Sequence, residues 1–481
     1  MKIPERGRDR AQVLADLEEF RSNDLAWRGG RVWAYVYDAG REVEQVGKQA
    51  FTSFMTENAL DPTAFPSLLR LENEVVAMAA AHLGGDESTV GSFTSGGTES
   101  ILLAVKAARD WAREHRPQVT EPEMILPVTA HAAFQKAAHY LCVKPVLVPV
   151  DPVTFKADVE AIRKAITPST VLLVGSAVSY AHGVVDPIPE IGRLALEHDL
   201  LFHVDGCIGG FLLPYFRRFG ATHVDFDLTV PGVTSISMDL HKYAFCPKGA
   251  SVVLYKSAAL RRHQIFACST WTGYTIVNPT VQSTKSGGPL AAAWAVMHHL
   301  GDEGYAALAR KIFDASKRLI AEIPTIPELR ILGTPELCLI AFTSDTVNVF
   351  HVIDEMKERD WYVQPQLGFL GSKENVHLSV TPSTSEWVDP FLADLRASVE
   401  AAKAIPADHG ADGLKESLAA IDPKSLTPEM FSQMLAMAGL QGVELPRRMA
   451  GINEMLNSLP ASLTETVLTQ FVNELFQHKP A

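Results

Sequence analysis

The chain has 481 residues, of which 47% are hydrophobic and 21% are charged, as in an ordinary water-soluble globular protein. Its formal net charge of −13 argues against a nucleic-acid-binding surface. The five cysteines are widely spaced and form no CxxC pair, so we expect no disulfide framework, no metal site and a reducing compartment, the cytoplasm. No segment has the length and apolarity of a membrane span, and the charged N-terminus does not resemble a secretory signal.

The first part of the chain is expected to be helical. Apolar residues recur at helical spacing in residues 11–20 and 43–55, on either side of an aromatic loop at 27–40. After a turn, helical spacing returns in residues 65–83. We treat residues 1–60 as an N-terminal helical segment with its aromatic loop.

From residue 84 to about 305, short apolar runs alternate with helical segments. The runs expected to be strands are residues 124–128, 146–150, 170–176, 200–205, 234–238 and 250–255. The helical segments between them include residues 100–115, 132–141 and 188–199. This alternation predicts an α/β fold with a mostly parallel sheet covered on both faces, and we assign residues 61–305 to this large domain.

A long helix over residues 289–323 leads into a second, smaller α+β pattern. Its strands are expected near residues 330–334, 337–344 and 376–380. The tail from about Asp412 to the end reads as helices with breaks at Pro423, Gly442 and Pro446. Residues 306–481 are therefore expected to form a small C-terminal domain with terminal helices.

A glycine-rich stretch, GSFTSGGTES at residues 91–100, runs directly into a helix. Small residues let backbone N–H groups approach an anion, and the helix N-terminus adds its positive end. The stretch therefore predicts a phosphate cradle around Gly97 and Thr98, although it lacks the GK[ST] ending of a Walker loop. A glycine-rich turn capped by Thr98 is the alternative interpretation.

Two further candidates follow predicted strands. Asp205 ends the strand at 200–205, where ligands bind in open α/β sheets, and its carboxylate can keep a heteroaromatic nitrogen protonated. A helix cap is the alternative for this aspartate. His131 follows another strand and opens a helix, so it could stack on a flat cofactor or cap that helix.

Lys242 lies in TSISMDLHKYAFCPKGASVVL, residues 234–254, where a strand gives way to a loop. A lysine held there by neighbours can lose its proton and attack an aldehyde, whereas a surface lysine at a strand end is the alternative. A phosphate cradle, a ring stacker, an acid for a ring nitrogen and an imine-forming lysine thus occur in the order 97, 131, 205, 242. This combination predicts pyridoxal 5′-phosphate as the cofactor.

Several segments are similar to the sphingosine-1-phosphate lyase family of fold-type I pyridoxal-phosphate enzymes, a group that also holds the amino-acid decarboxylases. The similar segments are TSGGTESILLAVKAARD, HAAFQKAA, HGVVDPIPEI, HVDGCIGGFLLP and VTSISMDLHKYAFCPKGASVVLY. The membrane anchor of eukaryotic members has no counterpart, so the chain resembles the soluble bacterial form. The resemblance implies a homodimer with shared active sites, in which residues 283–288 reach the partner's site.

The resemblance also implies roles for individual residues. Lys242 matches the Schiff-base lysine, Asp205 the partner of the pyridine nitrogen and His131 the ring-stacking histidine. The phosphate-holding set is matched by Gly97, Thr98, Ser237 and His241. The residues lining the substrate side are matched by Tyr37, Tyr180, His182 and Lys248.

Two positions depart from the family pattern. Asp61 stands where the family usually has a histidine that helps hold the substrate phosphate. A carboxylate there would repel a phosphate dianion, at a cost of about 1 to 4 kcal/mol for charges near 4 Å. Lys285 stands where the family usually has arginine, which keeps the charge but loses the bidentate fork. The cofactor machinery therefore matches the family, while the substrate-phosphate machinery differs.

The resemblance implies retro-aldol cleavage of a phosphorylated long-chain base to a fatty aldehyde and phosphoethanolamine. The base for the β-hydroxyl proton would be Tyr180, Lys248 or the freed amine of Lys242. Asp61 and Lys285 favour the alternative, a pyridoxal-phosphate decarboxylase or aldolase acting on a smaller amino substrate. A non-enzymatic scaffold is disfavoured because the lysine, aspartate and histidine set is complete.

Overall fold

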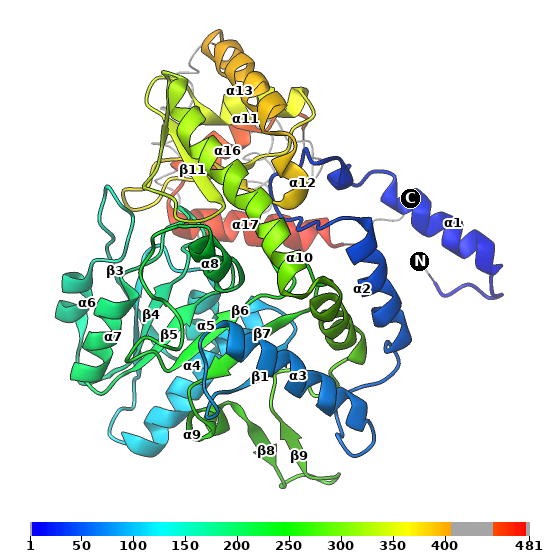
Figure 1. Cartoon of the computed structure of the whole chain (residues 1–481), viewed down its shortest axis with the longest axis vertical. Coiled ribbons are helices and arrows are strands. Elements are labelled where there is room, and N and C mark those ends of the chain that lie inside the picture. The colour runs from blue at the N-terminus through cyan, green and yellow to red at the C-terminus, as the bar shows by residue number, and fades with distance from the viewer. Residues whose placement is uncertain (1, 406–445, 478–481) are drawn as a thin grey trace.

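A central seven-stranded sheet organises the computed structural model, which describes residues 2–405 and 446–477 (Figure 1). The strands are β1 (Val90–Thr94), β2 (Glu123–Pro127), β3 (Lys144–Val148), β4 (Thr170–Ser176), β5 (Leu201–Asp205), β6 (Ser235–Met238) and β7 (Ser251–Tyr255). Their order across the sheet is β1-β7-β6-β5-β4-β2-β3. The six predicted strands are confirmed, and β1 is an additional strand inside the stretch that was interpreted as a glycine-rich loop.

The sheet is parallel from β3 to β6, while β7 runs antiparallel to both β6 and β1. This confirms the expectation of a mostly parallel sheet. The exception has a simple cause, because β6 and β7 are joined by residues 239–250, which contain no crossover helix. That connection instead forms the loop that carries Lys242.

Helices cover both faces of the sheet, as predicted. They are α3 (Pro66–His82), α4 (Gly97–His115), α5 (Ala133–Leu141), α6 (Val159–Ala165), α7 (Ile188–Glu197), α8 (Gly209–Arg218), α9 (Ala258–Arg261) and the 3-10 turn η2 (Arg262–Gln264). Successive strand residues serve opposite faces: Leu172 packs in the cluster under α4 and α5, and Leu173 in the cluster under α7 and α8. The burial of both faces explains why the strands read as continuous apolar runs.

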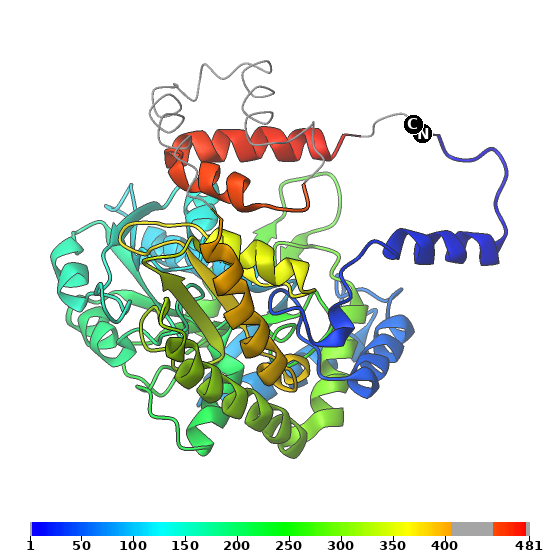
Figure 2. The ribbon, with the colours of Figure 1, turned by 90° about the horizontal axis from the view of Figure 1, so that it is seen from above.

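The N-terminal segment contains α1 (Arg10–Arg21), the turn η1 (Trp27–Gly29) and α2 (Arg41–Ser53). Helix α1 buries none of its residues and lies away from the body in both views (Figures 1 and 2). The aromatic loop behind it is anchored, because the fully buried Trp33 stacks on Phe391 at a centroid distance of 4.4 Å. This stacking brings the loop towards the active-site side of the sheet.

A second sheet, which is antiparallel and four-stranded, has the order β10-β11-β13-β12. Its elements are β10 (Leu329–Ile331), β11 (Leu339–Ser344), α11 (Val349–Glu358), β12 (Gln364–Gln366), β13 (Asn375–Ser379), α12 (Pro382–Ser385) and α13 (Val388–Lys403). Helix α10 (Gly287–Glu322), kinked at Gly301, leads into it through η3 (Ile323–Thr325). The three predicted strands are present, and β12 is an addition.

The hairpin of β8 (Phe266–Cys268) and β9 (Ile276–Asn278) projects below the large sheet in Figure 1 and was not predicted. At the C-terminus, α16 (Ala450–Ser458) and α17 (Ala461–Leu475) agree with the expected helical tail. The predicted breaks at Pro423 and Gly442 lie outside the described residues. In the two described ranges, no helix combines the length and apolarity that crossing a bilayer requires.

Candidate active site

A cavity of about 340 Å³ lies where β5 and β6 end, beside the N-terminus of α4. Seven of the residues predicted for the site line it: Gly97, Thr98, His131, Tyr180, Asp205, His241 and Lys242. They come from five different strand-to-helix or strand-to-loop junctions. The parallel sheet brings these junctions together because the carboxyl ends of its strands share one edge.

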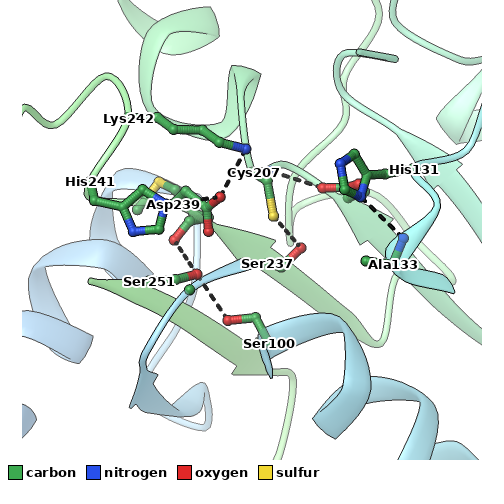
Figure 3. A network of polar contacts seen from close by, with 12 residues as sticks. Ser100, His131, Ala133, Cys207, Ser237, Asp239, His241, Lys242 and Ser251 are labelled. Atoms are coloured by element: carbon green, nitrogen blue, oxygen red, sulfur yellow. Dashed lines mark hydrogen bonds and ion pairs between the residues drawn. The ribbon is translucent and has the colours of Figure 1, made fainter. Parts of the chain in front are cut away.

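Lys242 reaches this cavity from the loop after β6 (Figure 3). Its Nζ lies 2.9 Å from Oδ2 of Asp239, and about one-fifth of its side chain is exposed. Burial, the largest single effect, disfavours the ammonium, but the charge and hydrogen bond of Asp239, with smaller contributions from neighbouring groups, together raise the pKa of Lys242 above its ordinary value. Without another reactant the pair is therefore ionised.

Asp239 itself was missed by the sequence analysis. Its side chain is buried, and although burial favours the neutral acid, Lys242 and then His241 lower the pKa of this carboxyl. Within the described part of the chain, its Oδ1 is buried without a hydrogen-bond partner. An acid three residues before Lys242, directly after the strand, was the signal that could have revealed it.

The cradle at the start of α4 requires glycine at position 97. A Cβ there would lie 2.7 and 2.8 Å from the carboxylate oxygens of Asp239 and 2.9 Å from Sγ of Cys207. The buried Glu99 holds the cradle in place, since it accepts hydrogen bonds from the N–H groups of Ser95 (2.6 Å) and Val281 (2.8 Å). The first N–H groups of α4 have no intrahelical acceptors and are available to an anion.

His241 adds a neutral donor to the cradle. The N–H of Ala250 donates to Nδ1 of His241 at 3.2 Å, so the ring proton resides on Nε2. Burial lowers the pKa of His241 to about 4, which keeps the imidazole neutral near pH 7. The Nε2–H group can therefore donate to an anionic oxygen at this end of the cavity.

Asp205 and His131 face the same cavity. The N–H of Cys207 donates to Oδ1 of Asp205 at 3.0 Å and orients the carboxylate. The N–H of Ala133 donates to Nδ1 of His131 at 3.2 Å, so this histidine caps α5 while its ring lines the cavity (Figure 3). For His131 the two interpretations drawn from the sequence are thus compatible.

Ser237 lies behind the cavity wall. Its hydroxyl lies 3.2 Å from Nε2 of His203 and 3.3 Å from Sγ of Cys207, and the side chain is fully buried. Burial raises the pKa of Cys207, so the thiol stays protonated. A direct contact between Ser237 and a cofactor phosphate stays a prediction.

Of the residues predicted for the substrate side, Tyr180 lines the cavity, whereas Tyr37 and Lys248 do not. The Tyr180 hydroxyl donates to Oε1 of Gln364 at 2.6 Å, and burial raises the pKa of both tyrosines, so their phenols stay protonated. Nζ of Lys248 lies 4.7 Å from the centre of the Tyr37 ring. Lys248 is exposed in this chain, but the partial burial of its amine, followed by the charge of Lys242, lowers its pKa.

His182 occupies a different environment from these residues. Its ring stacks on Phe155 at 4.0 Å, and its Nε2 lies 3.0 Å from Oγ of Ser372. The ring is buried, and this lowers its pKa to about 4. His182 does not line the 340 Å³ cavity, so its catalytic role stays a prediction.

Asp61 and Lys285 also lie apart from that cavity within one chain. Asp61 borders a second cavity of about 750 Å³ between α3 and the β8–β9 hairpin, and its carboxylate accepts from the N–H (2.8 Å) and hydroxyl (2.7 Å) of Thr63. Nζ of Lys285 is buried at 2.6 Å from Glu72 and 3.1 Å from the carbonyl of Phe93. The charge of Lys285 is therefore neutralised internally.

The 340 Å³ cavity fits pyridoxal phosphate on its own geometry. It combines a helix N-terminus that only glycine can line, a neutral histidine donor, a carboxylate for a ring nitrogen and a buried lysine. The partnerless Oδ1 of Asp239 shows that the polar groups of the site are not all satisfied by the described residues. The expected cofactor and the residues present therefore agree.

Comparisons with known proteins place the chain among such enzymes. Residues 2–345 match the model of the pyridoxal-dependent decarboxylase conserved domain. The sphingosine-1-phosphate lyase of Arabidopsis thaliana is 43% identical over 403 residues, which is 82% of this chain and 73% of that protein. The chain belongs to the sphingosine-1-phosphate lyase family. Its members are pyridoxal-phosphate-dependent lyases, so the predicted cofactor, fold class and enzyme class are confirmed.

Three further similarities were found. The solved structure of the Burkholderia pseudomallei sphingosine-1-phosphate lyase matches with a TM-score of 0.80 and 38% identity, over 87% of this chain and 96% of that chain. A probable L-aspartate decarboxylase of Pyrococcus furiosus is 32% identical over 77% of this chain and 96% of its own length. Residues 412–474 match the model of a C-terminal putative HTH domain of pyridoxal-dependent enzymes.

Proposed function

We propose that this lyase cleaves a phosphorylated long-chain base to a fatty aldehyde and phosphoethanolamine. The observation that carries the proposal is the convergence of Lys242, Asp205 and His131 on one cavity, in a chain whose relatives include sphingosine-1-phosphate lyases. The substrate is a small-molecule amine with a lipid tail.

Pyridoxal phosphate, when bound, supplies an aldehyde carbon that condenses with amines and a ring that accepts electrons released at the substrate's α-carbon. The amine of Lys242 would attach the cofactor through its aldehyde carbon. Asp205 would keep a proton on the ring nitrogen, and His131 would stack on the ring. The N–H groups at the start of α4, together with Nε2–H of His241, would hold the phosphate.

Among the candidate bases for the β-hydroxyl proton, we favour Lys248. Its pKa is lowered, so it offers a neutral amine more readily than an ordinary lysine does. Burial raises the pKa of Tyr180, whose phenol is a better hydrogen-bond donor than a base. Tyr37 lies beside Lys248 and orients its ammonium or amine by contact with the ring face.

We further propose that the enzyme acts as a cytoplasmic homodimer with shared active sites. Support comes from Asp61 and Lys285, which lie away from the cofactor cavity of their own chain and would serve the substrate only across an interface. The five cysteines are unpaired, as expected in a reducing compartment. Light scattering of the purified protein measures the oligomeric state, and a monomer with full activity would contradict the shared site.

The second candidate function is decarboxylation of a smaller amino acid. It is supported by the ion pair that neutralises Lys285 and by the carboxylate of Asp61, because both weaken a phosphate-binding role. A probable L-aspartate decarboxylase is also among the proteins similar to this chain, and it supports this alternative.

Product analysis separates the two functions. Cofactor-loaded protein is incubated with a sphingoid-base phosphate, or with a panel of amino acids that includes aspartate. Long-chain aldehyde that disappears in Lys242→Ala supports the lyase. Carbon dioxide from an amino acid, with no aldehyde from the lipid phosphate, would replace the lyase with the decarboxylase.

A further inference from the structure

The nitrogen of Lys242 has one close carboxylate partner that the established chemistry does not assign. Asp239 lies directly after β6, and its Oδ2 is 2.9 Å from Nζ of Lys242 (Figure 3). Only 2% of its surface is exposed, and burying a carboxylate this deeply is costly unless it is paired. Within the described ranges, Lys242 forms no other ion pair.

The backbone holds this pair in a fixed geometry. The N–H of Lys242 donates to the carbonyl of Asp239 at 3.3 Å, and the N–H of Asp239 donates to the carbonyl of Cys207 at 3.3 Å. Gly97 closes the opposite side, since any side chain there would overlap the carboxylate. Asp239 therefore has little freedom to turn away from the lysine nitrogen.

The other groups that face Lys242 carry no competing negative charge at contact distance. The loop after β5 contributes the protonated thiol of Cys207, and Asp205 at the end of β5 lines the same cavity without forming an ion pair with Lys242 among the described residues. The phenols of Tyr37 and Tyr180 stay protonated, and His241 is neutral. Lys248 is positively charged when protonated, and this charge disfavours a positive charge on the nearby Lys242.

We propose that Asp239 is a positioning residue that acts as the counter-ion of the Lys242 nitrogen. It aims the amine into the cavity and stabilises a positive charge on that nitrogen, both in the free lysine and when the nitrogen is attached to the cofactor carbon. A positive nitrogen makes that carbon more reactive towards an incoming amine. The inference rests on the proposed function in one respect, that Lys242 is the lysine that attaches the cofactor.

The first test uses cofactor-free protein, so the reactivity of the Lys242 amine is measured independently of catalysis. Wild type, Asp239→Asn and Tyr243→Phe are treated with trace acetic anhydride at fixed pH values between 8 and 10, and the acetylation rate of the Lys242 peptide is measured against that of the exposed Lys164. Loss of an adjacent opposite charge lowers a lysine pKa by about 1 to 3 units, so we expect Lys242 to be acetylated about 10- to 1000-fold faster in Asp239→Asn. Tyr243→Phe changes a buried neighbour without changing charge and should keep the wild-type rate.

A second variant guards against a misfolded Asp239→Asn. Asp239→Ala leaves room for a formate ion, and added formate is expected to slow the acetylation of Lys242 back towards the wild-type rate. Equal rates in wild type and both Asp239 variants, or an equal acceleration in Tyr243→Phe, would overturn the counter-ion role.

The third readout is the visible absorption of the cofactor-loaded protein. In Asp239→Asn the pH midpoint of that band should fall below the wild-type midpoint. If Lys242 were not the cofactor lysine, the band would persist in Lys242→Ala and would not change in Asp239→Asn, while the faster acetylation of Lys242 would remain. Failure of the proposed function is thus distinguishable from failure of the inference.

Discussion

Replacing Gly97 with alanine tests the cradle directly. The added Cβ would lie 2.7 Å from Oδ2 of Asp239, several tenths of an ångström closer than ordinary contact. Relieving this overlap requires the carboxylate to shift by several tenths of an ångström towards the cavity, which a bound cofactor would oppose. Overpacking of this kind costs about 1 to 3 kcal/mol, and we expect most of it to reduce cofactor affinity.

At 1.4 kcal/mol per tenfold, that cost corresponds to cofactor binding weakened by roughly 5- to 150-fold. The assay is titration of cofactor-free Gly97→Ala with pyridoxal phosphate, followed by absorbance. Gly451→Ala is the matched control, because it also lies in a helix and its Cβ would meet nothing within 4 Å. An affinity for Gly97→Ala within twofold of wild type would refute the close approach of Asp239 to the cradle.

Three further predictions concern charge. Lys248→Met should lower kcat by about 10² to 10⁴ with little change in KM, and an unchanged kcat would remove Lys248 as the base. Glu72→Gln strands the buried ammonium of Lys285 and should cost about 3 to 5 kcal/mol in urea unfolding; a loss under 1 kcal/mol would show that the pair is solvated. Burial lowers the pKa of His203 to about 4, whereas histidine in the unfolded state has a pKa of about 6.5. As the pH falls, the unfolded state therefore binds a proton first, and the free energy of unfolding decreases between about pH 6.5 and 4. Burial raises the pKa of Asp186 to about 6, so protonation of Asp186 partly offsets this loss of stability. The free energy of unfolding of His203→Gln should depend less steeply on pH in this range, and an unchanged dependence would contradict the role given to His203.

The cofactor residues could be predicted from the sequence because each follows a strand in the chain. Asp205 and Lys242 come directly after apolar runs, and parallel strands bring such positions to one edge. The resemblance then assigned their roles. His131 was found by the same local logic, whereas Gly97 was found from the glycine-rich stretch that runs into α4.

The missed features depend on partners far away in the sequence. Glu72 gives no local signal, and its role becomes clear only when α3 brings it to Lys285, 213 residues away. Strand β1 was not expected, because its residues were interpreted as part of the glycine-rich stretch; Gly91 is needed there because a Cβ would lie 2.6 Å from Leu254 of β7. Asp239 was overlooked although it precedes Lys242 by only three residues, because its importance comes from contact with Lys242 and with Gly97, which is distant in the sequence.

The most direct measurement of the central claim is to map where the cofactor attaches. Cofactor-loaded protein is reduced with borohydride, digested and analysed by mass spectrometry, so that the lysine linked to the pyridoxyl group is identified. The account predicts one modified peptide, carrying the group on Lys242 and absent from Lys242→Ala. Modification of Lys248 or Lys285 in its place would contradict the site described here.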